Sequence, residues 1–172
     1  MKTNKSTQYT NELPHEMLSG MGISVQHTPE QLAEMPDDIR HLIAEQAEFL
    51  RQHPVNAIYR VAVAGCLTRD GGVGVEFNST PEEGHKICLE NGQWASVLTV
   101  GCTVTYPDGS LARIVNGAGS QYTSENRGMA LVGSRLDNGD EIISTPQHHT
   151  MLVVRDDVPM PEDFLMITAG AV

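Results

Sequence analysis

The feature that most constrains this chain is a series of turn dipeptides that separate short apolar runs. From about residue 57 the apolar residues recur with a period of two or in runs of a few residues, which is typical of short strands. The dipeptides between them accept the positive φ angles of tight hairpin turns. The pattern predicts a mainly β body over residues 57–155, with turns at Asp70-Gly71, Asn91-Gly92, Asp108-Gly109, Asn116-Gly117 and Asn138-Gly139.

Composition and charge narrow the classes of partner. The 172 residues suit one domain with a smaller appendage, and the 22 acidic against 11 basic residues give a formal charge of −11. This charge disfavours nucleic acid and acidic membranes as partners. The N-terminus lacks the apolar core of a secretory signal, and no apolar run reaches the length of a membrane span. We therefore expect synthesis in the cytoplasm without a signal peptide.

Residues 1–56 have a different pattern and are expected to form an arm with short helices. Thr28-Pro29-Glu30-Gln31 combines an N-cap hydroxyl, a proline at the first helical position and a glutamine that completes a capping box. A second helix is predicted over Asp37–Arg51, whose apolar residues recur at helical spacing. We expect that apolar stripe to pack on the β body; recruitment of a partner or cargo is the alternative. Residues 156–172 are expected to form a linker that leads to a final docking strand.

Comparison of the chain with itself indicates an internal repeat. Residues 91–102 align with residues 126–134 if residues are dropped from the second copy, with Ala95 placed opposite Ala130. Each copy is a turn, a strand built around an alanine, then Val-Gly and a polar residue. Residues 61–66 are a third, partial copy.

These segments resemble the PAAR-repeat family over residues 58–145. Residues 64–72 resemble the family's entry segment, residues 114–117 its Ile-Val-x-Gly, and residues 141–144 its closing strand. The resemblance implies a conical body of short β-hairpins with an N-terminal helical extension. It also implies a structural role: one copy caps a trimeric β-helical spike of a phage tail or a type VI-like secretion machine and sharpens it for membrane piercing. The chain would then be delivered outside the cell at the tail tip and contact the target membrane only transiently.

A metal at the point of the cone is a further property of the family that this sequence does not match. The family's cones commonly hold zinc through histidines and a cysteine, but Asp70, Tyr106-Pro107 and Leu136-Asp137-Asn138 stand at the aligned positions. Zinc prefers sulfur and imidazole ligands, so we expect no metal and interpret these acids as turn residues. The alternative ligands are scattered along the chain: Cys66, His85, Cys102, His148 and His149. If His148 and His149 lie in a strand, they point to opposite faces, so at most one would serve a given site.

The sequence predicts no enzyme, although other functions stay open. No Gly-x-Ser-x-Gly elbow is present, and the cysteines Cys66 and Cys102 lie in the small-residue turns of the repeat. The three cysteines are expected to be reduced. Two alternatives to a purely structural cap remain: an adaptor that uses the cone as an anchor for an effector, and a small metal-dependent enzyme that uses the Cys/His set.

Overall fold

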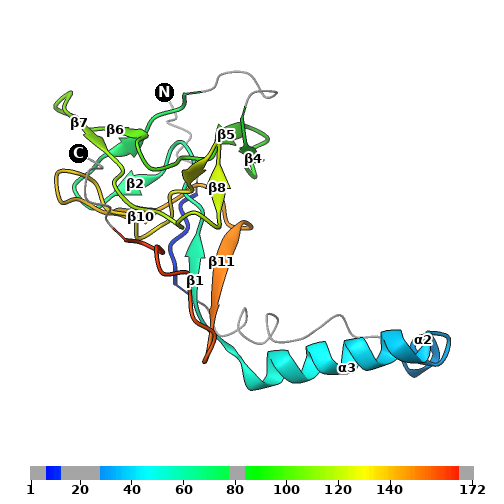
Figure 1. Ribbon diagram of the computed structural model, residues 1–172. Coiled ribbons are helices and arrows are strands. Elements are labelled where there is room, and N and C mark those ends of the chain that lie inside the picture. The colour runs from blue at the N-terminus through cyan, green and yellow to red at the C-terminus, as the bar shows by residue number, and fades with distance from the viewer. Residues whose placement is uncertain (1–6, 13–27, 78–83, 167–172) are drawn as a thin grey trace. The chain divides into compact units, whose positions relative to one another are not determined.

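The computed structural model describes residues 7–12, 28–77 and 84–166 and is mainly β, as predicted. The described residues divide into two compact units. The larger contains residues 7–12, 59–77, 84–152 and 160–166, and the smaller contains residues 28–58 and 153–159 (Figure 1). Each is described by itself.

Two helices lie in the smaller unit, at the positions predicted from the sequence. Helix α2 (Pro29–Ala33) has the predicted capping box, in which the Thr28 hydroxyl accepts from the Gln31 N–H and the Gln31 side chain accepts from the Thr28 N–H. Helix α3 (Asp37–Gln52) carries Asp37 and Asp38 in its first turn and has no buried residue. No helix of the described residues is long and apolar enough to cross a membrane.

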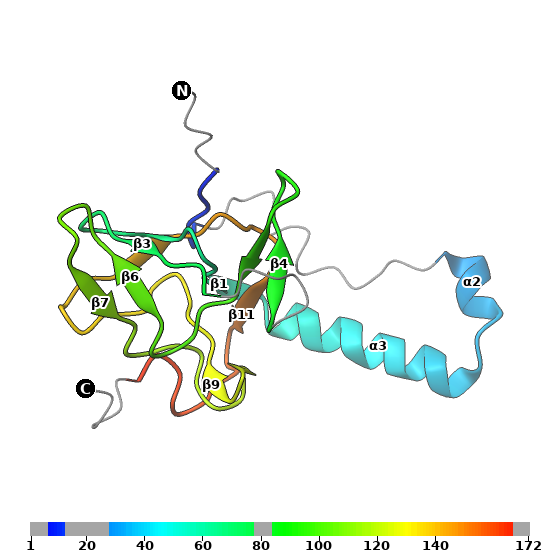
Figure 2. The ribbon, with the colours of Figure 1, turned by 90° about the horizontal axis from the view of Figure 1, so that it is seen from above.

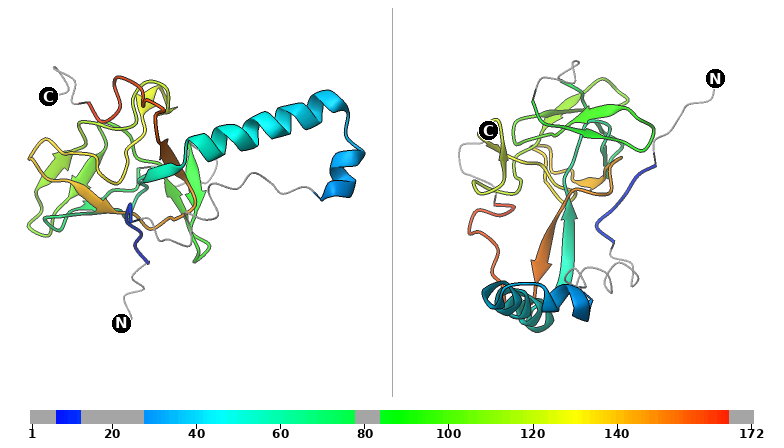
Figure 3. Two further views of the ribbon diagram at one scale, coloured as in Figure 1. Left: turned by 90° about the horizontal axis from the view of Figure 1, so that it is seen from below. Right: turned by 90° about the vertical axis from the view of Figure 1, so that its right-hand side faces the viewer.

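The strands are short and pair as hairpins. A five-stranded sheet has the order β10-β2-β3-β6-β7, and β1 pairs with β11, β4 with β5 and β8 with β9 (Figures 1 and 3). The strands, in chain order, are β1 (Val55–Arg60), β2 (Leu67–Thr68), β3 (Val73–Gly74), β4 (Lys86–Cys88), β5 (Trp94–Ser96), β6 (Thr103–Thr105), β7 (Leu111–Arg113), β8 (Thr123–Ser124), β9 (Arg127–Gly128), β10 (Ile142–Ser144) and β11 (Met151–Arg155).

Four of the predicted turn dipeptides close hairpins with the same turn geometry, and three of them lie at one end of the larger unit. Gly71, Gly109 and Gly139 have φ angles of 91°, 87° and 86°, which L side chains rarely adopt. The N–H of each glycine donates to the carbonyl three residues earlier, with N···O distances of 3.2, 2.9 and 3.0 Å. These hairpins lie on the side of the larger unit away from β4 and β5 (Figure 2). Asn91-Gly92 closes its predicted hairpin, between β4 and β5, with the same turn: Gly92 has a φ angle of 85° and its N–H donates to the Leu89 carbonyl (2.9 Å).

A closed ring of backbone hydrogen bonds joins three segments at the centre of the larger unit. The Ala62 N–H donates to the Ala130 carbonyl (2.8 Å), the Ala130 N–H to the Leu98 carbonyl (2.8 Å), and the Leu98 N–H to the Ala62 carbonyl (3.0 Å). All three residues are fully buried. Each segment therefore gives one bond to one neighbour and receives one from the other, so the three are related by approximate threefold symmetry.

The same relation continues into the turn that follows each ring residue. Gly65, Gly101 and Gly133 have φ angles of 93°, 95° and 110°, and the residue after each donates its N–H to the carbonyl three positions back. Residues 61–66, 97–102 and 129–134 are thus structurally equivalent without a gap. This corrects the predicted alignment, because Leu98, and not Ala95, is the counterpart of Ala130. Residues 61–66, predicted as a partial copy, are a complete one.

Both ends of the described chain belong to the larger unit, which differs from the predicted boundaries at residues 56 and 156. Tyr9 exchanges backbone hydrogen bonds with Thr145 (2.8 and 2.9 Å), and Asn11 links Val132 and Arg60. Near the other end, the Leu165 N–H donates to the Gly117 carbonyl (2.8 Å). Within the described residues this C-terminal segment forms turns, and residues 167–172 of the predicted docking strand lie outside the described residues.

The prediction of a hairpin turn at Asn116-Gly117 is wrong. Gly117 has no positive φ angle, and a Cβ atom at this position would lie 2.4 Å from the Met129 carbonyl oxygen. Asn116 is buried; its Nδ2 donates to the Leu165 carbonyl (2.9 Å) and its Oδ1 accepts from the Arg135 N–H (2.7 Å). The dipeptide is a crossing point of two backbone segments, and glycine is required there for space.

Candidate functional site

The tips of three hairpins meet at one side chain, Asp140: the β2–β3 hairpin, the β6–β7 hairpin and a third that the Arg135–Glu141 bridge closes. The Tyr106 hydroxyl, from the β6–β7 hairpin, donates to Asp140 Oδ2 (2.5 Å). The backbone N–H of Asp70, from the β2–β3 hairpin, donates to Asp140 Oδ1 (3.2 Å), which also accepts from the Glu141 N–H (2.7 Å). Asn138 Nδ2 donates to the Tyr106 hydroxyl (3.0 Å). Each hairpin therefore contributes to one hydrogen-bonded network.

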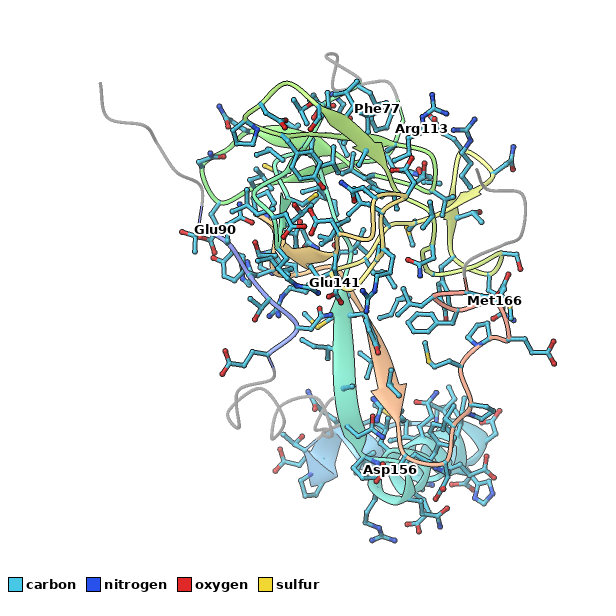
Figure 4. All side chains as sticks on the ribbon, turned by 90° about the vertical axis from the view of Figure 1, so that its left-hand side faces the viewer. Phe77, Glu90, Arg113, Glu141, Asp156 and Met166 are labelled. Atoms are coloured by element: carbon cyan, nitrogen blue, oxygen red, sulfur yellow. The ribbon has the colours of Figure 1, made fainter. Side chains whose placement is uncertain are left out.

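Because Asp140 is buried, this network is important for the stability of the fold. Asp140 is only 1% exposed, and Tyr106 is half-buried. Burial, followed by the hydrogen bond to Asp140, raises the pKa of the Tyr106 hydroxyl, so that it stays a donor through neutral pH. A buried carboxylate is expensive unless its oxygens accept hydrogen bonds, and here both do. Figure 4 views this end of the unit and labels Glu141, which follows Asp140 and forms an ion pair with Arg69.

The residues aligned with the family's zinc ligands lie at these tips, and their chemistry does not suit zinc. Asp70 contributes its backbone N–H, Tyr106 contributes its hydroxyl as a donor, and Asp137 Oδ1 accepts from the Arg113 N–H (3.1 Å). Leu136 is buried and apolar. Structural zinc is bound by thiolate and imidazole in a tetrahedral set, and these residues supply neither.

The alternative metal ligands proposed from the sequence do not gather at one site, although Cys66 lies near Cys102 and His148 lies beside His149. His85 Nδ1 is 2.7 Å from the Ser124 hydroxyl. His148 lies 3.3 Å from a Glu90 oxygen, and Cys66 is fully buried in the core. Over residues 7–12, 28–77 and 84–166, no group of three or more His, Cys, Asp or Glu could hold a metal ion.

The expectation that a strand directs His148 and His149 to opposite faces is not met. The pair lies in a loop between Thr145 and β11, and the two rings stack with centroids 3.6 Å apart. The Tyr9 ring lies 4.8 Å from that of His148. The loop therefore presents the two imidazoles to each other and not to separate sites.

The cysteines have different environments, and this difference gives a first testable prediction. All three are free; Cys66 is buried, Cys102 is half-buried and Cys88 is exposed. Burial raises the pKa of the Cys66 thiol to about 12, so the reactive thiolate is scarce at pH 8. We expect Ellman's reagent to modify Cys88 first and Cys66 only after unfolding in urea. Rapid native modification of Cys66 in a Cys88→Ser variant would contradict the buried position.

Asp140 is not among the candidate residues predicted from the sequence. Its only local signal is its place directly after the turn dipeptide Asn138-Gly139, and its partner Tyr106 lies 34 positions away. Comparison with known proteins adds no further guide to the site: no protein-family model, no curated protein and no solved structure matches this chain.

Proposed function

We propose that this chain is a PAAR-like spike tip, a cone of hairpins that caps a trimeric β-helical spike with one copy per trimer. The observation that carries the proposal is the ring formed by Ala62, Leu98 and Ala130. A single chain normally has no symmetry to match a trimer. Three near-equivalent segments arranged around one axis let one chain present similar groups to three identical partner chains.

In this proposal the three hairpins form the point and the opposite side meets the spike. The β4–β5 hairpin lies on that opposite side (Figure 2). Trp94 is part of β5, and its side chain is 53% exposed. A large aromatic side chain on an exposed surface suits a protein contact, because tryptophan is enriched at energetically dominant interface positions. The work is mechanical, without catalysis, nucleic acid or metal. The chain would act at the tip of a virion or injection apparatus and contact the target membrane transiently.

Stoichiometry tests this proposal. The chain should be co-expressed with a trimeric spike protein encoded beside it, and the complex weighed by native mass spectrometry. We expect one copy per trimer. Trp94→Ala should weaken binding by about tenfold or more, whereas Leu111→Ala, at an exposed position among the hairpins, should leave binding unchanged. Three copies per trimer, or no complex with any neighbouring spike, would refute the cap.

An additional adaptor role is favoured by one observation on the smaller unit. Helix α3 has no buried residue, and Ile39, Leu42 and Phe49 along it are 44%, 54% and 47% exposed. An amphipathic helix with an uncovered apolar stripe is a common recognition element. The double variant Leu42→Asp, Phe49→Asp should keep the spike complex but lose an effector encoded alongside. Retention of the effector would argue against this role.

A further inference from the structure

The hydrogen-bonded network around Asp140 is a feature that the cap function does not require. A metal-closed tip has a cation at its centre, and the surrounding side chains direct lone pairs at it. Here the polarity is reversed. A carboxylate lies at the centre, and O–H and N–H groups from Tyr106, Asp70 and Glu141 point toward it.

The network reaches all three hairpins with short connections. The β2–β3 hairpin contributes the Asp70 N–H, and its turn is fixed by the Gly72 N–H, which donates to Thr68 Oγ1 (2.8 Å). The β6–β7 hairpin contributes Tyr106. The third hairpin contributes Asp140, whose own N–H donates to Asn138 Oδ1 (3.0 Å). Removal of the central carboxylate would therefore leave donors without an acceptor in each hairpin.

The side chains around the network are closely packed, which leaves little space for a metal ion in place of the Asp140 carboxylate. A Cβ atom on Gly72 would lie 2.5 Å from Val104 Cγ1, 2.8 Å from Thr68 Oγ1 and 3.0 Å from the Tyr106 ring. Glycine is thus needed at this position for the Tyr106 ring to lie over the first hairpin and deliver its hydroxyl to Asp140. The surrounding residues fit the hydrogen-bonded arrangement and not a four-ligand metal site.

We propose that Asp140 closes the tip as a buried anion that ties the three hairpins together, in the place where related cones use a metal ion. The proposal concerns how the point is held and not what the base binds. It follows that the point forms without a metal supply and keeps its structure in the presence of a chelator.

The test uses the isolated full-length protein without a histidine tag. Tyr106→Phe removes one donor and keeps the ring, so we expect the melting temperature to fall by about 5 °C. Asp140→Asn, which replaces an acceptor with a donor, should lower it at least as much. The matched control is Tyr122→Phe, at a partly exposed tyrosine, with a change below about 1 °C.

Hydrogen exchange gives a local measurement that does not depend on global stability. In Tyr106→Phe the amides of Asp70 and Glu141, which donate to Asp140, should exchange about tenfold faster or more, while the Ala62 amide in the central ring keeps its protection. Elemental analysis should find no stoichiometric zinc, and EDTA should leave melting of the parent protein unchanged.

Several results would overturn the proposal. These are near-stoichiometric zinc with a large loss of stability in EDTA, or a Tyr106→Phe protein whose melting and tip-amide exchange equal those of the parent. Because no spike protein is present, these outcomes are independent of the cap function. A cap that binds one copy per trimer could still have a metal-closed tip, and a carboxylate-closed tip could belong to a protein that binds no spike.

Discussion

Leu98→Ala is expected to lower the free energy of unfolding by about 2–5 kcal/mol, which is the range for truncating a fully buried leucine. Leu98 is 0% exposed and is the only large side chain among the three ring residues. Its Cδ1 lies so close to Gly74 that a Cβ there would be 2.7 Å away. The backbone bonds of the ring do not need the leucine side chain, so the loss should come from packing, as a cavity in the core.

Urea denaturation followed by circular dichroism measures this loss. The matched control is Leu111→Ala, because Leu111 is 65% exposed and its truncation should change stability by less than about 0.5 kcal/mol. Both variants remove the same atoms, so the difference between them isolates burial. If Leu98→Ala lost no more than Leu111→Ala, the Leu98 side chain would not lie in a packed core.

The tips and the strands could be predicted from local sequence because their causes are local. In each Asp-Gly or Asn-Gly dipeptide the glycine supplies the left-handed residue that the turn needs, and this was confirmed at Gly71, Gly109 and Gly139. The capping box at Thr28 also depends only on residues close together in the sequence. By contrast, the turn between β8 and β9 uses Glu125 and Asn126 with φ angles of 52° and 66°. Neither residue is glycine, so the dipeptide signal was absent.

The threefold relation was only partly predictable, because the copies share conformation more than residue identity. The ring position holds alanine, leucine and alanine, and aligning the alanines Ala95 and Ala130 shifted the register. The constant element is the glycine at 65, 101 and 133, which the turn requires for its positive φ angle. An alignment anchored on those glycines recovers the three copies without gaps.

The tip network could not be predicted for a different reason. Tyr106 and Asp140 become neighbours only when separate hairpins pack around the axis. The residues next to each of them in the sequence do not indicate that the two side chains will meet. The sequence does predict that the aligned metal positions lack nitrogen and sulfur donors. What occupies the centre instead is a consequence of tertiary packing, which local patterns do not encode.

Gly117→Ala is expected to lower the free energy of unfolding by about 3 kcal/mol or more, at the upper end for an overpacked interior. The added Cβ would lie 2.4 Å from the Met129 carbonyl oxygen and 3.0 Å from its carbon, both backbone atoms that cannot rotate away. Hydrogen bonds on both sides of Gly117 hold its backbone close to that of Met129. The Ala118 N–H donates to that same Met129 oxygen (2.8 Å), and the Leu165 N–H donates to the Gly117 carbonyl (2.8 Å).

A comparison with Gly109 distinguishes two reasons for which a position can require glycine: lack of space for a side chain, and a positive φ angle. Gly109 has a φ angle of 87° and open space around its Cα, so Gly109→Ala should lose only about 1–2 kcal/mol through strain. Asparagine tolerates the left-handed region, so Gly109→Asn should recover part of that loss, whereas Gly117→Asn should be no better than Gly117→Ala. Urea denaturation of the four variants measures these differences. Recovery of stability by asparagine at position 117 would mean that conformation, and not the contact with Met129, is the reason for glycine there.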